Sequence, residues 1–254
     1  MTTAATGALL AEVAPLVGRL GSAFYFAPGT LARGRALGLD GYRFYFLGRG
    51  GVLGDVEAPV VASAFGYFEP GLVAHMWSSA RDRVPPRRAG RAYLECAHQM
   101  GRAQLGGVGG LGEWCAAAEA VAAAAELAGL ALFAGVLGEP LPDDAPARAM
   151  QLLVLLRELR GSAHLLAVRA VGLAPRVAHY LRRPGDFTLF GWQEADVPEV
   201  TDADRGRAAA AEALTDELVA PAFEVLGEPE RSALLAGLRA MAGALEPPRA
   251  PSAG

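Results

Sequence analysis

Residues 114–137 read WCAAAEAVAAAAELAGLALFAGVL, and no other stretch points so directly to the fold. Alanine and leucine dominate it, and both residues favour helix. The stretch is the most apolar part of the chain, but Glu119 and Glu126 interrupt it. Two carboxylates inside the apolar run disfavour a membrane span. We therefore expect a single Ala-rich helix over 113–137, buried in a helical bundle.

Helical spacing continues on both sides of this stretch. Leu9, Val13, Val17 and Leu20 give an amphipathic first helix, and strand patterns are almost absent. Because proline is well suited to the first turn of a helix, Pro59, Pro70 and Pro86 mark three further starts. We expect an all-α fold with a break at 27–29, a glycine turn at 48–51, a helix from Pro85–Pro86 to about Gln104, and further helices near 147–160, 162–171, 175–183, 205–221 and 229–245.

A Pro-rich acidic segment, Gly138–Pro146 (GEPLPDDAP), has no apolar period and is the predicted domain boundary. It separates an aromatic-rich N-terminal helical domain, 1–137, from a second helical domain, 147–245. The tail 246–254 is predicted to be disordered. The start of the chain lacks a basic segment followed by an apolar run, so we expect a cytoplasmic protein.

The chain has 254 residues and a net charge of −4, and it contains no Lys, no Ile and no Asn. All 23 basic residues are therefore Arg. The absence of Lys excludes Schiff-base enzymes and the Walker A phosphate loop. The absence of Asn excludes the kinase and papain types of active site that depend on it. Any bound anion has to be held by Arg, His or backbone N–H groups.

Cofactor and metal signatures are missing as well. The four histidines at 75, 98, 164 and 179 form no HxxxH or HExxH pattern, and Cys96 and Cys115 form no CxxC pair. No dinucleotide or flavin motif occurs. We expect no metal, no cofactor and two buried, unreactive thiols.

Five short motifs resemble those of an actinobacterial two-domain helical family. They are FYFAP at 24–28, GLDGY at 38–42, YFLGR at 45–49, FGYFEP at 65–70 and LRELRGSAH at 156–164. In that family an N-terminal helical domain precedes a winged-helix domain related to MarR-type regulators. The resemblance covers most of residues 20–245 and implies the same two-part, helical architecture.

The sequence departs from that family in the half that would bind DNA. After Gly191–Trp192 the family continues with a full helix and a two-stranded wing, whereas Gln193–Thr201 is a short acidic segment here. Residues 141–254 hold 16 acidic residues and 12 Arg, while residues 1–140 hold 11 of each. DNA binding needs a basic surface. We therefore interpret the second half as a winged-helix-like scaffold without recognition helix and wing, and expect no nucleic-acid partner.

The densest polar group lies at Arg157, Glu158, Arg160 and His164. On a helix, Arg157, Arg160 and His164 are spaced i, i+3, i+7 and share one face. Such a face can form an anion clamp of arginines, with His164 or Glu158 as general acid or base. An interdomain ion-pair network would need the same residues, and both interpretations stay open.

A second candidate region lies in the first 80 residues. Arg49 stands among glycines at Gly48–Gly51, where backbone N–H groups can cradle an anion, or where the arginine can simply fix a turn. Aromatic residues crowd the same part of the chain and either line a pocket or belong to the core. We predict that Tyr25, Tyr42, Tyr45, Tyr67 and Trp77 line the pocket, with Tyr45 and His75 as further catalytic candidates.

Five arginines within eleven positions form the clearest charge cluster: Arg81, Arg83, Arg87, Arg88 and Arg91. A cluster of this kind binds phosphate or sulfate, docks an acidic partner such as a carrier protein, or is only a solvated helix face.

These features together predict a cofactor-independent tailoring enzyme or binding protein of actinobacterial natural-product biosynthesis. Its substrate is expected to be an anionic, amino-acid-derived small molecule. The most specific form of the hypothesis is elimination, or intramolecular displacement with ring closure, such as aziridine formation by loss of sulfate. The alternative is a MarR-like transcriptional regulator that binds DNA and a small ligand. We expect a homo- or hetero-oligomer in either case.

Overall fold

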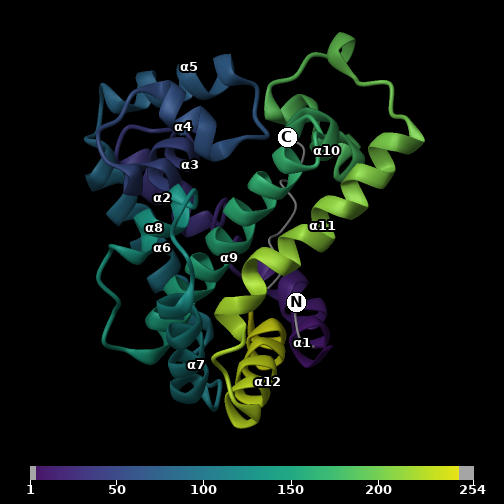
Figure 1. Ribbon diagram of the computed structural model, residues 1–254. Coiled ribbons are helices and arrows are strands. Elements are labelled where there is room, and N and C mark those ends of the chain that lie inside the picture. The colour runs from purple at the N-terminus through teal and green to yellow at the C-terminus, as the bar shows by residue number, and fades with distance from the viewer. Residues whose placement is uncertain (1–3, 246–254) are drawn as a thin grey trace.

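The computed structural model describes residues 4–245, and this part of the chain is all-α (Figure 1). It contains twelve α-helices, four short 3-10 turns and no strand within those residues. The predicted fold class is confirmed. The predicted disordered tail at 246–254 lies outside the described residues.

The helices follow the chain in a simple order. They are α1 Ala4–Leu20, α2 Pro28–Ala36, α3 Gly41–Gly50, α4 Ala58–Phe65, α5 Pro70–Arg81, α6 Pro86–Gln104, α7 Leu111–Ala124, α8 Ala131–Leu137, α9 Ala145–Ala170, α10 Pro175–Arg182, α11 Asp202–Phe223 and α12 Glu228–Ala244. The 3-10 turns are η1 Gly51–Leu53, η2 Pro184–Asp186, η3 Thr188–Phe190 and η4 Glu194–Asp196.

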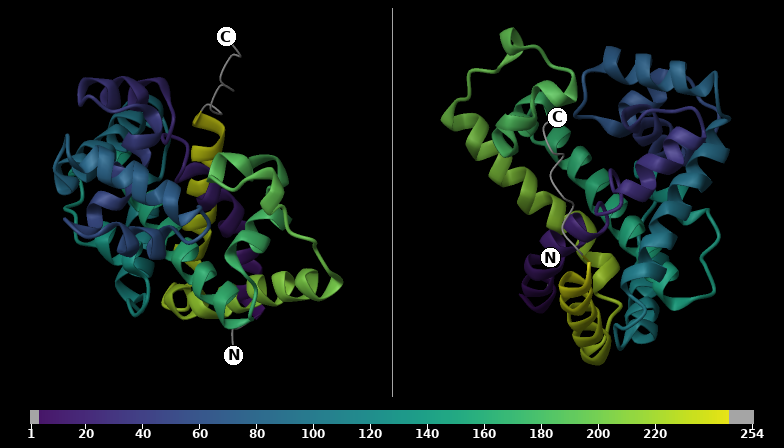
Figure 2. Two further views of the ribbon diagram at one scale, coloured as in Figure 1. Left: turned by 90° about the horizontal axis from the view of Figure 1, so that it is seen from above. Right: turned by 180° about the vertical axis from the view of Figure 1, so that it is seen from behind.

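Helix α9 organises the molecule, because it packs against α1, α6, α7, α8, α10 and α11. It runs between α2–α6 on one side and α10–α11 on the other, and at one end of the molecule α7 packs directly against α12 (Figure 1 and Figure 2). The side chain of Asp144 caps its first turn by accepting from the backbone N–H of Ala147 at 3.1 Å. From Gln151 to Leu156 every residue is buried, which is typical of a helix surrounded by others.

The prediction of two helices, 147–160 and 162–171, is wrong, because α9 continues through Gly161. A glycine inside a helix costs only about 1 kcal/mol relative to alanine. The packing of α9 against α11 on the far side of Gly161 outweighs that cost. This continuity places Arg157, Arg160 and His164 on one unbroken helix.

The single helix predicted over 113–137 is also wrong, since residues 125–130 separate α7 from α8. The Glu126 carboxylate accepts from the backbone N–H groups of Leu127 and Ala128, at 2.8 and 3.1 Å. Gly129 adopts a left-handed conformation with φ of 78°. These two local features end the helical path, and α8 begins in a new direction.

The predicted glycine turn at 48–51 lies inside α3 and η1 instead. A Cβ atom on Gly48 would lie 2.6 Å from the Tyr93 ring, and one on Gly51 would lie 2.1 Å from the carbonyl oxygen of Pro86. The glycines are therefore explained by the close approach of α3 and η1 to α6. The break expected at 27–29 is the start of α2, with Pro28 in its first turn.

One hydrophobic cluster extends from Leu9 to Leu245 and joins helices from before and after residues 138–146. The division of the chain into two domains stays a prediction. Among residues 4–245, no helix combines the length and the apolar character that crossing a bilayer would require.

Candidate functional site: an arginine-lined pocket

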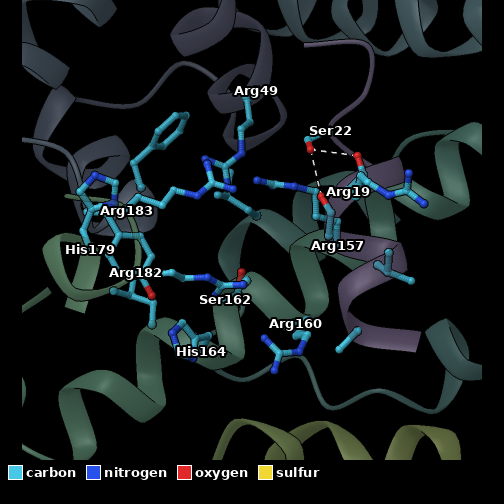
Figure 3. A pocket seen from close by; sticks show the side chains of 18 of the residues that line it. Arg19, Ser22, Arg49, Arg157, Arg160, Ser162, His164, His179, Arg182 and Arg183 are labelled. Carbon is cyan, nitrogen blue, oxygen red and sulfur yellow. Dashed lines mark hydrogen bonds between the residues drawn. The ribbon is translucent and has the colours of Figure 1, made fainter. Parts of the chain in front are cut away.

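A cavity of about 550 Å³ opens beside the middle of α9. Its walls come from α1, α3, α4, α9 and α10, and side chains from α1, α3, α9 and α10 extend into it (Figure 3). No Asp or Glu is among the described residues that line it. Six arginines line it: Arg19, Arg49, Arg157, Arg160, Arg182 and Arg183.

Beside the cavity, Glu158 forms a buried ion cluster with Arg49 and Arg157, called the Glu158 cluster below. Arg49 donates from Nε to Oε1 at 2.8 Å and from Nη2 to Oε2 at 2.7 Å, so both carboxylate oxygens are bound. Arg157 donates from Nη1 to Oε1 at 3.0 Å. Burial alone would raise the pKa of Glu158, but the two guanidinium groups lower it to about 2. The cluster therefore carries one net positive charge near neutral pH.

Aromatic rings enclose this cluster. The Arg49 guanidinium lies 4.6 Å from the centre of the Phe65 ring, and that of Arg157 lies 4.9 Å from the centre of Tyr25. Arg49 also donates to the Tyr45 hydroxyl at 3.2 Å. The rings hold the guanidinium groups in place and present an apolar wall next to the positive charge.

A second group, the Glu212 cluster, lies farther along α9 and contains Arg160, Arg182, Glu212 and Asp216. Arg160 Nη2 donates to Glu212 at 2.8 Å and to Asp216 at 3.2 Å, and Arg182 lies 3.6 Å from Glu212. Two carboxylates balance two guanidinium groups, so this cluster is neutral.

His164 stands next to the Glu212 cluster. Its Nδ1 lies 2.8 Å from Thr215 Oγ1, and its Nε2 lies 3.8 Å from Glu212 Oε1. Burial lowers the pKa of His164, Arg160 and Arg182 lower it further, and Glu212 opposes them. The imidazole is therefore neutral at pH 7.

Three polar atoms at the cavity wall are buried and have no hydrogen-bond partner within the described residues. They are the Tyr67 hydroxyl, Arg160 Nε and His179 Nε2. Only one other such side-chain atom, Trp114 Nε1, occurs in residues 4–245. Buried polar atoms normally have partners. These three belong to residues of the cavity wall, but the atoms themselves are buried away from the cavity and make no contact with its interior. Burial raises the pKa of Tyr67, which keeps its hydroxyl a donor.

The segment 187–192 covers one side of the cavity. Phe190 stacks between Phe68, at a ring distance of 4.0 Å, and His179, at 3.8 Å. The Tyr42 hydroxyl donates to the carbonyl of Leu189 at 2.8 Å, and Trp192 Nε1 donates to the carbonyl of Tyr67 at 2.9 Å. These contacts attach the segment to the N-terminal half of the chain.

The structure brings together most of the predicted site residues. Arg49, Tyr45, Tyr67, Arg157, Arg160 and His164 line the cavity, and Glu158 and Tyr25 lie directly behind it. Three predicted residues lie elsewhere. Trp77 is fully buried and donates to the Val56 carbonyl, His75 is exposed beside Arg43, and Tyr42 holds the covering segment without lining the cavity.

Several residues of the site were not among the predicted ones: Arg19, His179, Arg182, Arg183, Phe190, Glu212 and Thr215. Arg182–Arg183 is the only basic doublet of the second half, so a signal was present. Its meaning depended on how α10 folds back towards α9, which no local pattern shows. The contacts between α9 and α11 likewise join residues that lie far apart in the sequence.

The cluster at 81–91 is mostly used within the molecule. Arg81 pairs with Asp55 and Glu57, Arg83 donates to the Gly38 carbonyl, and Arg87 and Arg91 pair with the buried carboxylate of Glu139. Arg88 is exposed and has no ion-pair partner within residues 4–245. Docking of an acidic partner stays a prediction, and Arg87, Arg88 and Arg91 are still exposed enough to take part in it.

No group of His, Cys, Asp and Glu within residues 4–245 is arranged to hold a metal ion. Cys96 and Cys115 are buried and free, and burial raises the pKa of both thiols, that of Cys115 to about 11.

The sequence model of a helix-turn-helix family matches residues 11–248. The chain belongs to this helix-turn-helix family. No curated protein and no solved structure matches the chain. In this member of the helix-turn-helix family, residues 184–201 hold only the turns η2, η3 and η4, and α10 contributes three residues to the pocket wall.

Proposed function

We propose that this protein binds a small organic anion in the arginine-lined pocket. The observation that carries the proposal is the charge of the wall: six guanidinium groups line the cavity and no carboxylate does. Four carboxylates pair with these arginines from behind, namely Glu158, Glu212, Asp216 and Asp186. Two positive charges remain uncompensated. Arginine is well suited to bidentate binding of carboxylate, sulfate and phosphate.

The ligand class follows from the two kinds of wall. The Glu158 cluster and Arg19 offer the positive end, and the rings of Phe65, Phe68 and Phe190 offer an apolar side. A volume of about 550 Å³ suits a small molecule. An amino-acid-derived anion with an apolar portion fits both walls.

We further propose that the bound anion undergoes a non-redox reaction. Arg49 and Arg157 are held rigidly by Glu158, so they can stabilise negative charge without rearranging. This arrangement supports elimination, or intramolecular displacement with ring closure, in which the arginines receive the leaving anion. Aziridine formation by loss of sulfate, as in natural-product biosynthesis, is the most specific form of the proposal.

Binding is tested by isothermal titration calorimetry with inorganic sulfate and phenyl sulfate, and with phenol as the uncharged comparison. Arg19 is exposed and has no ion-pair partner in residues 4–245, so Arg19→Gln removes charge without stranding a buried group. We expect Arg19→Gln to weaken phenyl sulfate binding roughly tenfold, because a charge-assisted hydrogen bond contributes about 1.5–3 kcal/mol.

Arg239→Gln is the matched control, because Arg239 is an exposed helix residue whose one ion-pair partner within residues 4–245 is Glu12. It should leave binding unchanged. Equal affinity of wild type and Arg19→Gln, or equal binding of phenol and phenyl sulfate, would contradict the proposal. Independently of these titrations, mass spectrometry of small molecules that co-purify with the protein would identify the natural ligand.

A second candidate function is a ligand-responsive regulator related to the MarR type. The match to a helix-turn-helix family over residues 11–248 favours it. The charge balance of residues 141–254, with 16 acidic residues against 12 Arg, opposes it. Retardation of duplex DNA at 150 mM salt would favour the regulator over the enzyme.

A further inference from the structure

We infer that Nε2 of His164 accepts a proton from the bound ligand, and that Thr215 is the positioning residue that keeps this nitrogen free. The inference rests on the proposed function, because His164 lines the same cavity as the arginines. Thr215 lies on α11, one helix away from the cavity wall, and is fully buried.

The hydrogen bonds of Thr215 fix the tautomer of His164. Thr215 Oγ1 lies 2.6 Å from the carbonyl oxygen of Ala211, and two oxygen atoms approach this closely only when they share a proton. The hydroxyl has one hydrogen, so Thr215 donates it to Ala211. Nδ1 of His164, 2.8 Å from the same Oγ1, must then be the donor. The remaining nitrogen, Nε2, carries the lone pair.

Burial is the main cause that lowers the pKa of His164, and the charged groups around it act in both directions. Arg160 from its own helix and Arg182 from α10 oppose protonation, while Glu212 and Asp216 from α11 favour it. The Tyr67 ring lies 6.4 Å away on the remaining side. Glu212 is already bound by Arg160, and its distance of 3.8 Å from Nε2 is too long for a hydrogen bond. Nε2 therefore has no hydrogen-bond partner within residues 4–245, and His164 lines the cavity.

The proton transfer is simple to balance. An N–H or O–H bond of the ligand breaks, an Nε2–H bond forms, and the electron pair stays on the ligand atom. Glu212, at 3.8 Å, compensates the new imidazolium charge. His164 follows Arg157 by seven residues, or about 10 Å along the helix axis. The ligand class is therefore an anion that also carries an amine or hydroxyl several atoms from its charged group.

The tautomer is measured by ¹⁵N nuclear magnetic resonance of histidine-labelled protein, with His164→Gln to assign the signal among the four histidines. Wild type should show the Nδ1–H form at pH 7.5. Thr215→Val removes the hydroxyl that accepts from His164 Nδ1–H. It should shift the ratio of the two His164 tautomers at least fivefold towards the Nε2–H form. Thr215→Ser keeps the hydroxyl and should restore the wild-type signal. An Nε2–H signal in wild type, or no change in Thr215→Val, would overturn the assignment.

Diethyl pyrocarbonate reports whether the free nitrogen faces the cavity, because it acylates an unprotonated imidazole nitrogen that it can reach. We expect acylation of His164 in wild type, located by mass spectrometry, and at least fivefold slower acylation in Thr215→Val. The exposed His75 is the internal control, and its labelling should not respond to Thr215. Absence of a His164 adduct in wild type would overturn the inference.

Sulfate separates this inference from the proposed function. If both hold, 50 mM sodium sulfate protects His164 from acylation in wild type. If His164 is acylated and shows the Nδ1–H form but sulfate neither binds nor protects, the anion pocket is refuted while the assignment of Nε2 stands. If sulfate binds but Nε2 carries the proton, the proposed function stands and the inference fails.

Discussion

Arg49 on α3 binds both carboxylate oxygens of Glu158 on α9, at 2.8 and 2.7 Å, across 109 residues of sequence. The pair connects the N-terminal helices to the central helix and holds the arginine at the cavity wall. The Glu158 side chain is only 1% exposed, so its charge depends on the guanidinium groups for stabilisation. Arg49 and Glu158 therefore contribute both to the stability of the fold and to the anion binding that we propose.

The first prediction concerns the loss of this carboxylate charge. Glu158→Gln leaves Arg49 and Arg157 close together without their counterion. Removing one partner of a buried ion pair costs about 3–5 kcal/mol. We expect the free energy of unfolding, measured by urea denaturation at pH 7, to fall by about 3 kcal/mol.

Glu12→Gln is the control for that measurement, because Glu12 pairs with Arg239 on the surface, where both side chains are at least half exposed. Solvent screens such pairs, and the expected loss is below about 1 kcal/mol. A Glu158→Gln protein as stable as Glu12→Gln would show that the Glu158 cluster does not hold α3 to α9.

The second prediction concerns pH. The pKa of Glu158 is about 2 in the folded chain, below its ordinary value of 4.5. A lowered folded pKa contributes stability that is present above about pH 4.5 and is lost as the pH falls towards 2. For Glu158 the contribution is on the order of 3 kcal/mol. Wild type and Glu158→Gln should therefore converge in stability between pH 5 and pH 2.5.

Urea midpoints at pH 7, 5, 4 and 3 measure this convergence. Asp40, Asp144, Asp204 and Glu212 also have lowered pKa values, but both proteins contain them, so their contributions cancel. A constant difference between the two proteins across this range would contradict a depressed pKa at Glu158.

Site residues that depend on local spacing along the chain could be predicted from the sequence, whereas those that depend on tertiary contacts could not. Arg157, Arg160 and His164 follow from helical spacing alone, since positions i, i+3 and i+7 share a face wherever the helix lies. Arg49 was found through its glycines, but those glycines serve packing against Tyr93 and Pro86. Arg49 lies at the cavity wall, but the reason given for its glycines was wrong, because a local motif does not show which neighbour needs the space.

Residues that depend on tertiary contacts escaped prediction. Thr215 reads as an ordinary helix residue, and its role arises only because α11 lies beside α9. His75 and Trp77 were both predicted at the pocket, yet residues two positions apart on a helix point in different directions. Trp77 is consequently buried while His75 is exposed. The fold class was easier, because composition and periodicity act over the whole chain.

The third prediction concerns the segment 187–192 that covers the cavity. Trp192→Phe keeps an aromatic ring but removes the hydrogen bond to the Tyr67 carbonyl. One such bond contributes about 1 kcal/mol, so local opening should become roughly fivefold more frequent. Cleavage by trypsin after the exposed residue Arg182 should accelerate by the same factor, whereas Pro184 protects the bond after Arg183.

Tyr180→Phe is the matched control for proteolysis. Its ring contacts Phe187, and its hydroxyl has no hydrogen bond shown within residues 4–245. It should leave the cleavage rate unchanged. Equal cleavage of wild type and Trp192→Phe would show that the segment is held by its ring contacts alone.

The fourth prediction uses two glycines that look alike in sequence and differ in surroundings. A Cβ atom on Gly161, in the middle of α9, has no neighbour within 4 Å, whereas one on Gly48 would lie 2.6 Å from the Tyr93 ring. Gly161→Ala should stabilise the protein by about 0.5–1 kcal/mol, because alanine loses less entropy in a helix. Gly48→Ala should destabilise it by about 1–3 kcal/mol through overpacking.

Urea denaturation of both variants tests the continuity of α9 through the pocket. Gly161 lies at the cavity wall between Arg160 and Ser162, and its substitution adds one methyl group there. If α9 were broken at Gly161, as the sequence suggested, alanine would bring no helical gain and stability would not rise. A more stable Gly161→Ala protein that still binds phenyl sulfate would show that one unbroken helix carries Arg157, Arg160 and His164.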